Sequence, residues 1–177
     1  MFRILLVATA LFVATCAAPY TLPANDRADI AKRIAGFERA FVNGDTTEVV
    51  NVVPPRMITA IATRGGVSET VLRREMAKLT REATRNVKVV SFGMSLANAK
   101  FLTTPTGRAY GLIQTRTVVH TPGGTKLQSN TQTLTLEDGG KWYLIRIEDA
   151  GQIDLMRSVY PDIKGVTFPK GREKVIG

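Results

Sequence analysis

The chain has 177 residues, of which 44% are hydrophobic and 22% charged, and its formal net charge is +9 at pH 7. This composition is typical of a folded domain with an apolar core, and it excludes disorder as the main description of the chain. One cysteine and one histidine exclude a disulfide scaffold and a cysteine- or histidine-rich metal site, so we expect no metal and no cofactor.

Residues 1–18 have the layout of a bacterial export signal. Arg3 provides a short basic start, Ile4 to Ala14 form an apolar run, and small residues follow. The run is too short to cross a bilayer, which takes about 20 residues. The sequence therefore predicts an exported protein, located in the periplasm or attached to the cell envelope.

The single cysteine lies at the end of this signal. The segment Val13-Ala14-Thr15-Cys16 resembles the lipid-attachment motif of bacterial lipoproteins, although Thr15 departs from the small residue usual before the cysteine. Either Cys16 is lipidated after cleavage, or ordinary cleavage occurs nearby and no anchor forms. In both cases we expect residues 19–25 to be an unstructured leader or tether, and contact with a membrane only through such an anchor.

Four helices are predicted next, and apolar residues at helical spacing define their buried faces. The first helix, at 26–43, carries its apolar stripe at Ile30, Ile34, Phe37 and Phe41. Two short helices follow at 46–53 and 56–63. A longer helix at 69–84 is capped by Ser68, and its expected buried face comprises Leu72, Met76, Leu79 and Ala83.

From residue 87 the apolar period changes from about 3.6 to about 2, which predicts strands. They lie at 87–94 (continuing to 103), 108–120, 126–137 and 141–149, and a helix follows at 152–160. The order of elements predicts an α+β fold, with the N-terminal helices packed on a curved antiparallel sheet. We expect one domain at 26–160 and an irregular tail at 161–177.

The two faces of this sheet can be separated by counting. If both Gly-Gly turns are two- or four-residue loops, the alternation carries across three strands. The face expected to turn toward the helices is apolar at one end and polar at the other, which predicts a pocket at the polar end. The opposite face, with Trp142, Arg116 and Arg146, is expected to meet water or a second copy of the chain. The predicted pocket-lining residues are Thr115, Thr117, Asn130, Gln132, Tyr143 and Asp149.

Two short segments carry a family resemblance. Phe37 to Asp45 (FERAFVNGD) and Gly139 to Ile145 (GGKWYLI) resemble the nuclear transport factor 2-like superfamily, over about residues 26–160. The resemblance implies a cone-shaped α+β fold with a pocket between helices and sheet. The superfamily includes isomerases, dehydratases, epoxide hydrolases and non-catalytic binding modules, so the fold alone does not select a function.

Two classes of function follow. The first is a non-catalytic exported module that binds a small apolar ligand or an envelope protein, with pairing of two copies through the open sheet face. The alternative is an isomerase or dehydratase in which Asp149 acts as a general base. Asp149 equally fits the cap of the helix that follows it. Arg116 fits either an anionic ligand or a cross-strand ion pair, and His120 fits a surface position. The basic residues are spread out, so no nucleic acid partner is predicted.

Overall fold

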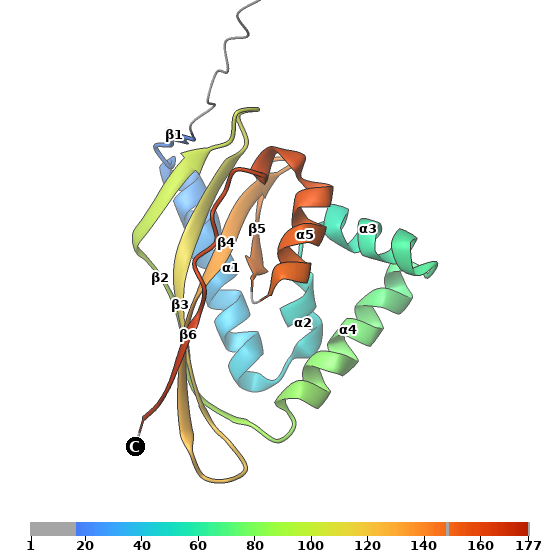
Figure 1. Ribbon diagram of the computed structural model, residues 1–177, viewed down its shortest axis with the longest axis vertical. Coiled ribbons are helices and arrows are strands. Elements are labelled where there is room, and N and C mark those ends of the chain that lie inside the picture. The colour runs from blue at the N-terminus through green and yellow to red at the C-terminus, as the bar shows by residue number, and fades with distance from the viewer. Residues whose placement is uncertain (1–16, 148, 177) are drawn as a thin grey trace, which may run out of the picture.

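The computed structural model describes residues 17–147 and 149–176, so Cys16 and nearly all of the predicted export signal lie outside the described residues. The described residues contain five α-helices and a six-stranded antiparallel sheet (Figure 1), which confirms the α+β class. The strand order is β1-β2-β3-β4-β5, and β6 also pairs with β4. Within the described ranges, no helix is both long and apolar enough to span a membrane.

The elements follow the order that the periodicity predicts. Asp45 and Ser68 cap the starts of two helices through their side chains, and Gly44 and Gly66 end two others with left-handed backbone. The helices are α1 (Ala24–Asn43), α2 (Thr46–Asn51), α3 (Pro55–Gly65), α4 (Glu69–Thr84), α5 (Ala150–Val159) and the short 3-10 helix η1 (Pro161–Ile163). The strands are β1 (Ala18–Pro19), β2 (Lys88–Thr103), β3 (Ala109–His120), β4 (Lys126–Asp138), β5 (Lys141–Arg146) and β6 (Arg172–Val175).

Both ends of the described chain are more ordered than predicted. Ala18 and Pro19, expected at the border of an unstructured leader, pair with β2 as strand β1. The tail was expected to be irregular, and this is wrong for η1 and for β6, which pairs with β4 from Leu127 to Asn130. The C-terminal segment is therefore part of the sheet.

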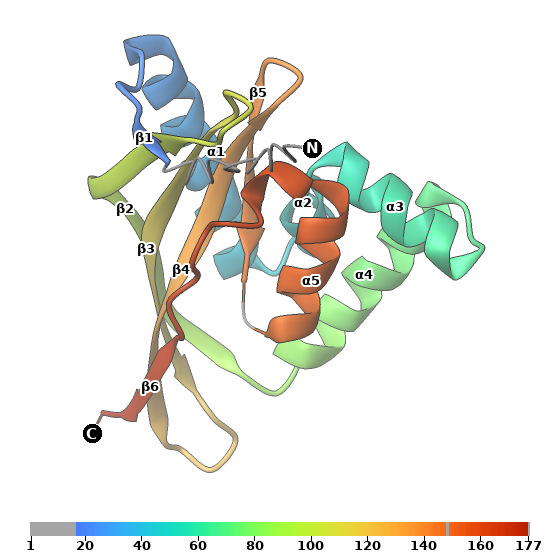
Figure 2. The same cartoon turned by 45° about the horizontal axis from the view of Figure 1, so that its top comes forward.

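Helices cover both faces of the sheet at the end where β4 pairs with β5, in contrast to the predicted open face. Trp142, expected on that open face, is only 3% exposed and packs under α1. Figure 2 shows α1 and α5 on opposite sides of the sheet, and we name the two faces after these helices. Trp142 is thus not part of an exposed patch, and pairing of two copies of the chain stays a prediction. The α1-face core comprises Ile30, Ile34, Phe37, Phe101, Ala109, Ile113, Trp142 and Leu144.

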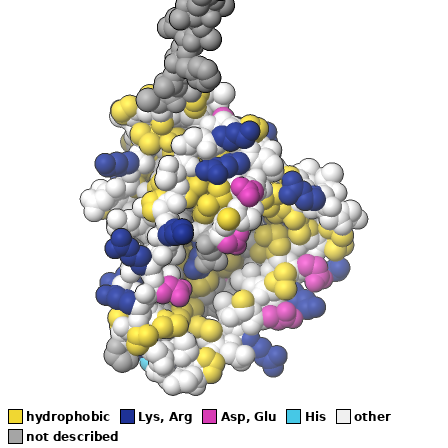
Figure 3. Space-filling view, in the orientation of Figure 1, with side chains coloured by type: hydrophobic (Ala, Val, Ile, Leu, Met, Phe, Trp, Pro, Cys, Tyr) yellow, Lys and Arg dark blue, Asp and Glu magenta, His cyan; other side chains and the backbone are white. Residues whose placement is uncertain are grey.

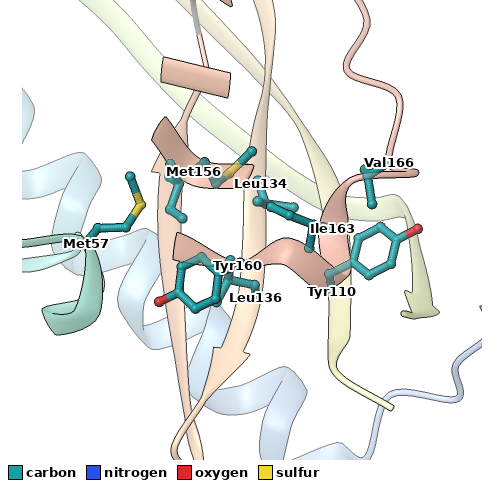
Figure 4. Close-up of a cluster of buried hydrophobic side chains, with 9 residues drawn as sticks. Met57, Tyr110, Leu134, Leu136, Met156, Tyr160, Ile163 and Val166 are labelled. Atoms are coloured by element: carbon teal, nitrogen blue, oxygen red, sulfur yellow. The ribbon is translucent and has the colours of Figure 1, made fainter. Parts of the chain in front are cut away.

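The α5 face has its own buried core (Figure 4). Side chains from β3, β4 and β5 meet residues from α3, α5, η1 and the segment after it. This core lies at the end of the sheet where β4 pairs with β5, so the half of β4 that pairs with β6 carries no such cover. Its members are Met57, Tyr110, Leu134, Leu136, Ile145, Met156, Tyr160, Ile163 and Val166.

The turn between β3 and β4 overturns the predicted division of side chains between the faces. The backbone N–H of Thr121 donates to the carbonyl oxygen of Thr125 at 2.9 Å, so the loop proper is Pro122-Gly123-Gly124, with Gly124 at φ +79°. A three-residue loop with a left-handed third residue is a common hairpin connection. Because its length is odd, the alternation shifts by one residue, and Gln114 lies opposite Gln132.

The shift separates residues that were predicted to share a pocket. Ile113, Thr115 and Thr117 face α1, whereas Asn130 and Gln132 lie on the α5 face. The turn between β4 and β5 is the two-residue Gly139-Gly140 loop that the prediction assumed, so the alternation between those two strands is correct. Of the two assumed loop lengths, the one between β3 and β4 was therefore wrong. This error grouped the side chains of β3 with the wrong side chains of β4.

Helix α4 packs differently from its predicted face. Ala77 is its buried residue, whereas Leu79 is 62% exposed and Ala83 is exposed. The helix packs against α2 and α3 rather than against the sheet. Its buried face is therefore rotated away from the apolar stripe that the sequence shows.

Candidate functional site

Residues 164–171, which we call the strap, connect η1 to β6 and run along the α5 face of the sheet beside β4 (Figure 1). Val166 is buried in the α5-face core, and its carbonyl oxygen accepts a hydrogen bond from Arg157 Nη2 at 3.1 Å. The Arg157 guanidinium also lies 5.9 Å from the centre of the Phe168 ring. At the other end Gly171 lies so close to Thr131 that an added Cβ would approach its Cγ2 to 2.8 Å. The strap is thus held at both ends.

A groove lies between the strap and strands β2 to β4. It consists of two adjacent hollows with cavity volumes of about 740 Å³ and about 470 Å³. The hollows share Gln114, Gln132 and Pro169, so they form one continuous depression with two ends. Both volumes are within the range of about 300–1,000 Å³ that is usual for small-molecule sites.

The larger, polar hollow is positively charged. Arg116 from β3, Lys170 from the strap and Arg172 from β6 line it. None of the ion pairs between described residues includes these three cations. Neither hollow is lined by an acidic side chain or a histidine in the described part of the chain. In the space-filling view, Lys and Arg side chains lie along the sheet side of the molecule, where acidic side chains are few (Figure 3).

A buried amide holds Arg116 in place. Arg116 Nη2 donates to Gln128 Oε1 at 2.7 Å, and Gln128 Nε2 donates to Asn130 Oδ1 at 3.2 Å. Gln128 is only 7% exposed. The guanidinium is thus positioned by a neutral partner, and its charge is left for another group to balance.

The smaller hollow is apolar on its floor and inner wall. Leu102, Tyr110 and Leu112 form the floor, and Val166 and Pro169 belong to the strap side. Polar residues complete the lining, namely Asn98 and Lys100 of β2 and Thr167 of the strap, besides the two shared glutamines. Burial raises the pKa of Tyr110, so its phenol stays neutral at physiological pH. At the junction of the hollows, Gln132 Oε1 is buried without a hydrogen-bond partner among the described residues. A buried acceptor without a partner is uncommon in proteins.

The predicted pocket residues separate into two groups. Asn130 and Gln132 line the polar hollow, and Thr115 borders it, but the Thr115 hydroxyl contacts that of Thr133 at 2.7 Å on the α1 face. Thr117 is buried on the α1 face. Tyr143 is buried outside both hollows, with the Arg33 guanidinium 4.8 Å from its ring centre.

Asp149 caps α5. Its Oδ1 accepts a hydrogen bond from the backbone N–H of Gln152 at 2.8 Å, and the residue is exposed. It borders a separate hollow between α5 and the far side of the strap. Of the two roles that the sequence left open, the geometry provides the cap, and it places this carboxylate outside the groove.

Sequence reasoning missed most residues of the groove, including three polar side chains of its larger hollow. Gln114 was assigned to the opposite face because of the turn length, and Lys170 and Arg172 belong to the tail that was expected to be irregular. For Arg116, the expected cross-strand ion pair is not among those found between described residues. His120 ends β3 opposite Lys126, outside the groove.

A polar cluster fixes the root of the strap. Asp162, the middle residue of η1, accepts hydrogen bonds from Arg108 Nε at 2.7 Å and from the hydroxyls of Thr104 and Thr106. Burial lowers the pKa of Arg108, but its bond to Asp162 outweighs this effect and the net pKa is raised, so the guanidinium stays charged. The Tyr160 hydroxyl donates to Asp138 Oδ2 at 3.0 Å.

Tyr160→Phe is expected to change the response of stability to alkaline pH. Burial and the bond to Asp138 raise the pKa of Tyr160 above its ordinary value of 10.0. Above about pH 10 the unfolded chain therefore loses this proton before the folded protein does, and the free energy of unfolding falls by about 1.4 kcal/mol per pH unit. Urea unfolding between pH 8 and 11 measures this slope, which should be shallower in the variant. Equal slopes would contradict the assignment, since other tyrosines contribute to both proteins alike.

Comparison with family models, with curated proteins and with solved structures finds no match to this chain. Among the described residues, no group of three or more His, Cys, Asp or Glu side chains comes together as a metal site would need. The shape and charge of the groove are therefore the features that bear on function.

Proposed function

We propose that the protein is an exported, non-catalytic binding module that holds a small-molecule ligand in the groove beneath the strap. The observation that carries this proposal is a preformed groove whose cations lack ion-pair partners among the described residues. Surplus charge of one sign in a cleft attracts a ligand of the opposite sign. The proposal refines the small apolar ligand that the sequence predicts, because the groove also has a charged end.

The residues that line the groove favour ligand binding over isomerase or dehydratase chemistry. Abstraction of a proton needs a positioned base within hydrogen-bond reach of the ligand. The described residues that line the groove include no aspartate, glutamate or histidine, and Asp149 is bonded to the start of α5. The enzyme alternative thus lacks the residue on which it depended.

Export and the cone-shaped architecture belong to the same proposal. Export is supported by the basic, apolar and small-residue order of residues 1–18, with Cys16 as the candidate for lipid attachment. A cone of the nuclear transport factor 2-like kind is supported by the two sequence segments and by the order of helices before a meander of strands. An exported module with such a groove would carry or sense its ligand outside the cytoplasm.

Gln114→Trp tests the groove directly. Gln114 is exposed on the floor shared by both hollows, so an indole there should fill the space that the ligand needs. Native mass spectrometry of protein purified from the cells that naturally produce it should show a bound small molecule that the variant lacks. Val90→Trp, at a position in β2 that is 47% exposed and outside both hollows, is the matched control and should keep the ligand. A wild-type protein without ligand, or an equally loaded Gln114→Trp variant, would overturn the proposal.

A further inference from the structure

The strand register arranges the floor of the groove in rows. Arg116 lies opposite Asn130, and Asn130 lies opposite Arg172 on the next strand. Neighbouring strands are about 4.8 Å apart, so the two arginines flank Asn130 with their backbones about 10 Å from each other. On the remaining side of Arg116 the row ends at Gly93, which has no side chain. An anionic group above Asn130 is therefore within reach of two guanidinium groups.

Apolar side chains replace amides in the floor along β3 and β4. The row next to the arginines pairs Gln114 with Gln132, and the following row pairs Leu112 with the buried Leu134 on one side and with the exposed Lys100 of β2 on the other. Rows on one face are two residues apart, or about 7 Å, so the apolar row lies about 13 Å from the cationic one. The two arginines and the apolar floor are thus separated by the length of a small elongated molecule, and the exposed Lys100 adds one cation beside the apolar floor.

We propose that the ligand of this groove is a single-chain amphiphilic carboxylate, with its carboxylate at Arg116 and Arg172 and its hydrocarbon chain in the apolar hollow. This inference rests on the proposed function, since it specifies the ligand of the same groove. A compact inorganic anion would leave the apolar hollow unused, and a neutral apolar molecule would leave the arginines unbalanced. A single hollow of about 470 Å³ with an apolar floor matches one chain rather than the two chains of a bilayer lipid.

Calorimetric titration of the full chain, freed of bound ligand, with carboxylates of increasing length tests this assignment. Octanoate, decanoate and dodecanoate are used below their micellar concentrations. Dodecanol, which has the chain without the charge, and inorganic phosphate, which has the charge without the chain, are the comparison ligands. Each methylene that enters the hollow should tighten the dissociation constant about fourfold. Dodecanol and phosphate should each bind at least tenfold more weakly than dodecanoate. Affinity independent of chain length, equal affinity for dodecanol, or binding only to phosphatidylglycerol vesicles would overturn the inference.

Arg116→Gln assigns the position of the carboxylate. Loss of a charge-assisted hydrogen bond at this exposed site should weaken dodecanoate binding about tenfold and leave dodecanol binding unchanged. Arg74→Gln, which removes an exposed arginine of α4, is the matched control and should bind like the wild type. If Arg116→Gln binds dodecanoate as the wild type does, the carboxylate assignment is wrong. If Gln114→Trp still displaces a natural ligand in that case, the proposed function stands and only the ligand class fails.

Discussion

Replacing Phe37 with alanine is expected to lower the free energy of unfolding by about 3–5 kcal/mol. Phe37 is 7% exposed in the α1-face core, and its ring centre lies 5.8 Å from that of Phe41 and 5.3 Å from that of Phe92. Alanine would remove the aromatic contact between α1 and β2 and leave a cavity. Equilibrium unfolding in urea, followed by circular dichroism, measures the loss.

Val42→Ala is the control within the same helix. Val42 is 55% exposed, so its truncation should change the free energy of unfolding by no more than about 0.5 kcal/mol. A loss below about 1 kcal/mol for Phe37→Ala would show that α1 does not hold this face of the sheet.

Asp162→Ala is expected to lower the free energy of unfolding by about 3 kcal/mol, at the lower end for a broken buried ion pair. The Asp162 side chain is 9% exposed, and it is the nearest acidic partner of the Arg108 guanidinium, whose side chain is 18% exposed. Without it the remaining acidic partner of Arg108 among the described residues is Asp138, at 3.4 Å, beside the bond from Arg108 Nη1 to the Glu137 carbonyl oxygen. Because Asp162 adjoins the strap, ligand affinity should fall as well. Urea unfolding and calorimetry measure the two effects.

Asp154→Ala separates this effect from the mere loss of a negative charge. Asp154 is exposed on α5, so its removal should leave stability within about 0.5 kcal/mol of the wild type. Asp162→Asn, which keeps the shape and one acceptor oxygen, should lie between the alanine variant and the wild type. Equal stability of Asp154→Ala and Asp162→Ala would rule out the polar cluster as the anchor of the strap.

Local signals in the sequence were enough to predict most of the helices and strands. The stripe of Ile30, Ile34 and Phe37 is the buried face of α1 in the structure. The sequence allows Asp149 to be either a helix cap or a general base, and its hydrogen bond from the backbone N–H of Gln152 shows that it is a cap. These features depend on a few neighbouring residues, so the sequence contains the information that they need.

The prediction of which side chains share a face of the sheet depended on the lengths of the hairpin loops, which composition does not reveal. Both hairpin turns contain Gly-Gly, yet Gly139-Gly140 closes a two-residue loop, whereas Gly123 and Gly124 belong to a three-residue loop with Pro122. The difference of one residue exchanges the two faces of a strand. The prediction of a mixed pocket failed for this reason, although β2, β3 and β4 were predicted to within one residue of their observed bounds.

The groove was hidden for a second reason. Strand β6 has the sequence REKV, its four residues are all exposed, and nothing in its pattern indicates a strand. Its pairing is decided by the edge of β4 that β5 leaves free beyond Thr133. Strand formation that depends on a distant partner is set by tertiary contacts rather than by propensity, so Lys170 and Arg172 could be assigned to the site only from the structure.

The shared edge of β4 has a consequence for the order of assembly. Strand β5 joins it directly across a tight turn, whereas β6 arrives only after α5, η1 and the strap have been added. Contacts between segments close in sequence form sooner, because the chain loses less entropy in closing a short loop. A folding molecule would thus complete its hairpins while the groove still lacks the side formed by the strap and β6. The protein would then be able to bind its ligand only at the end of folding.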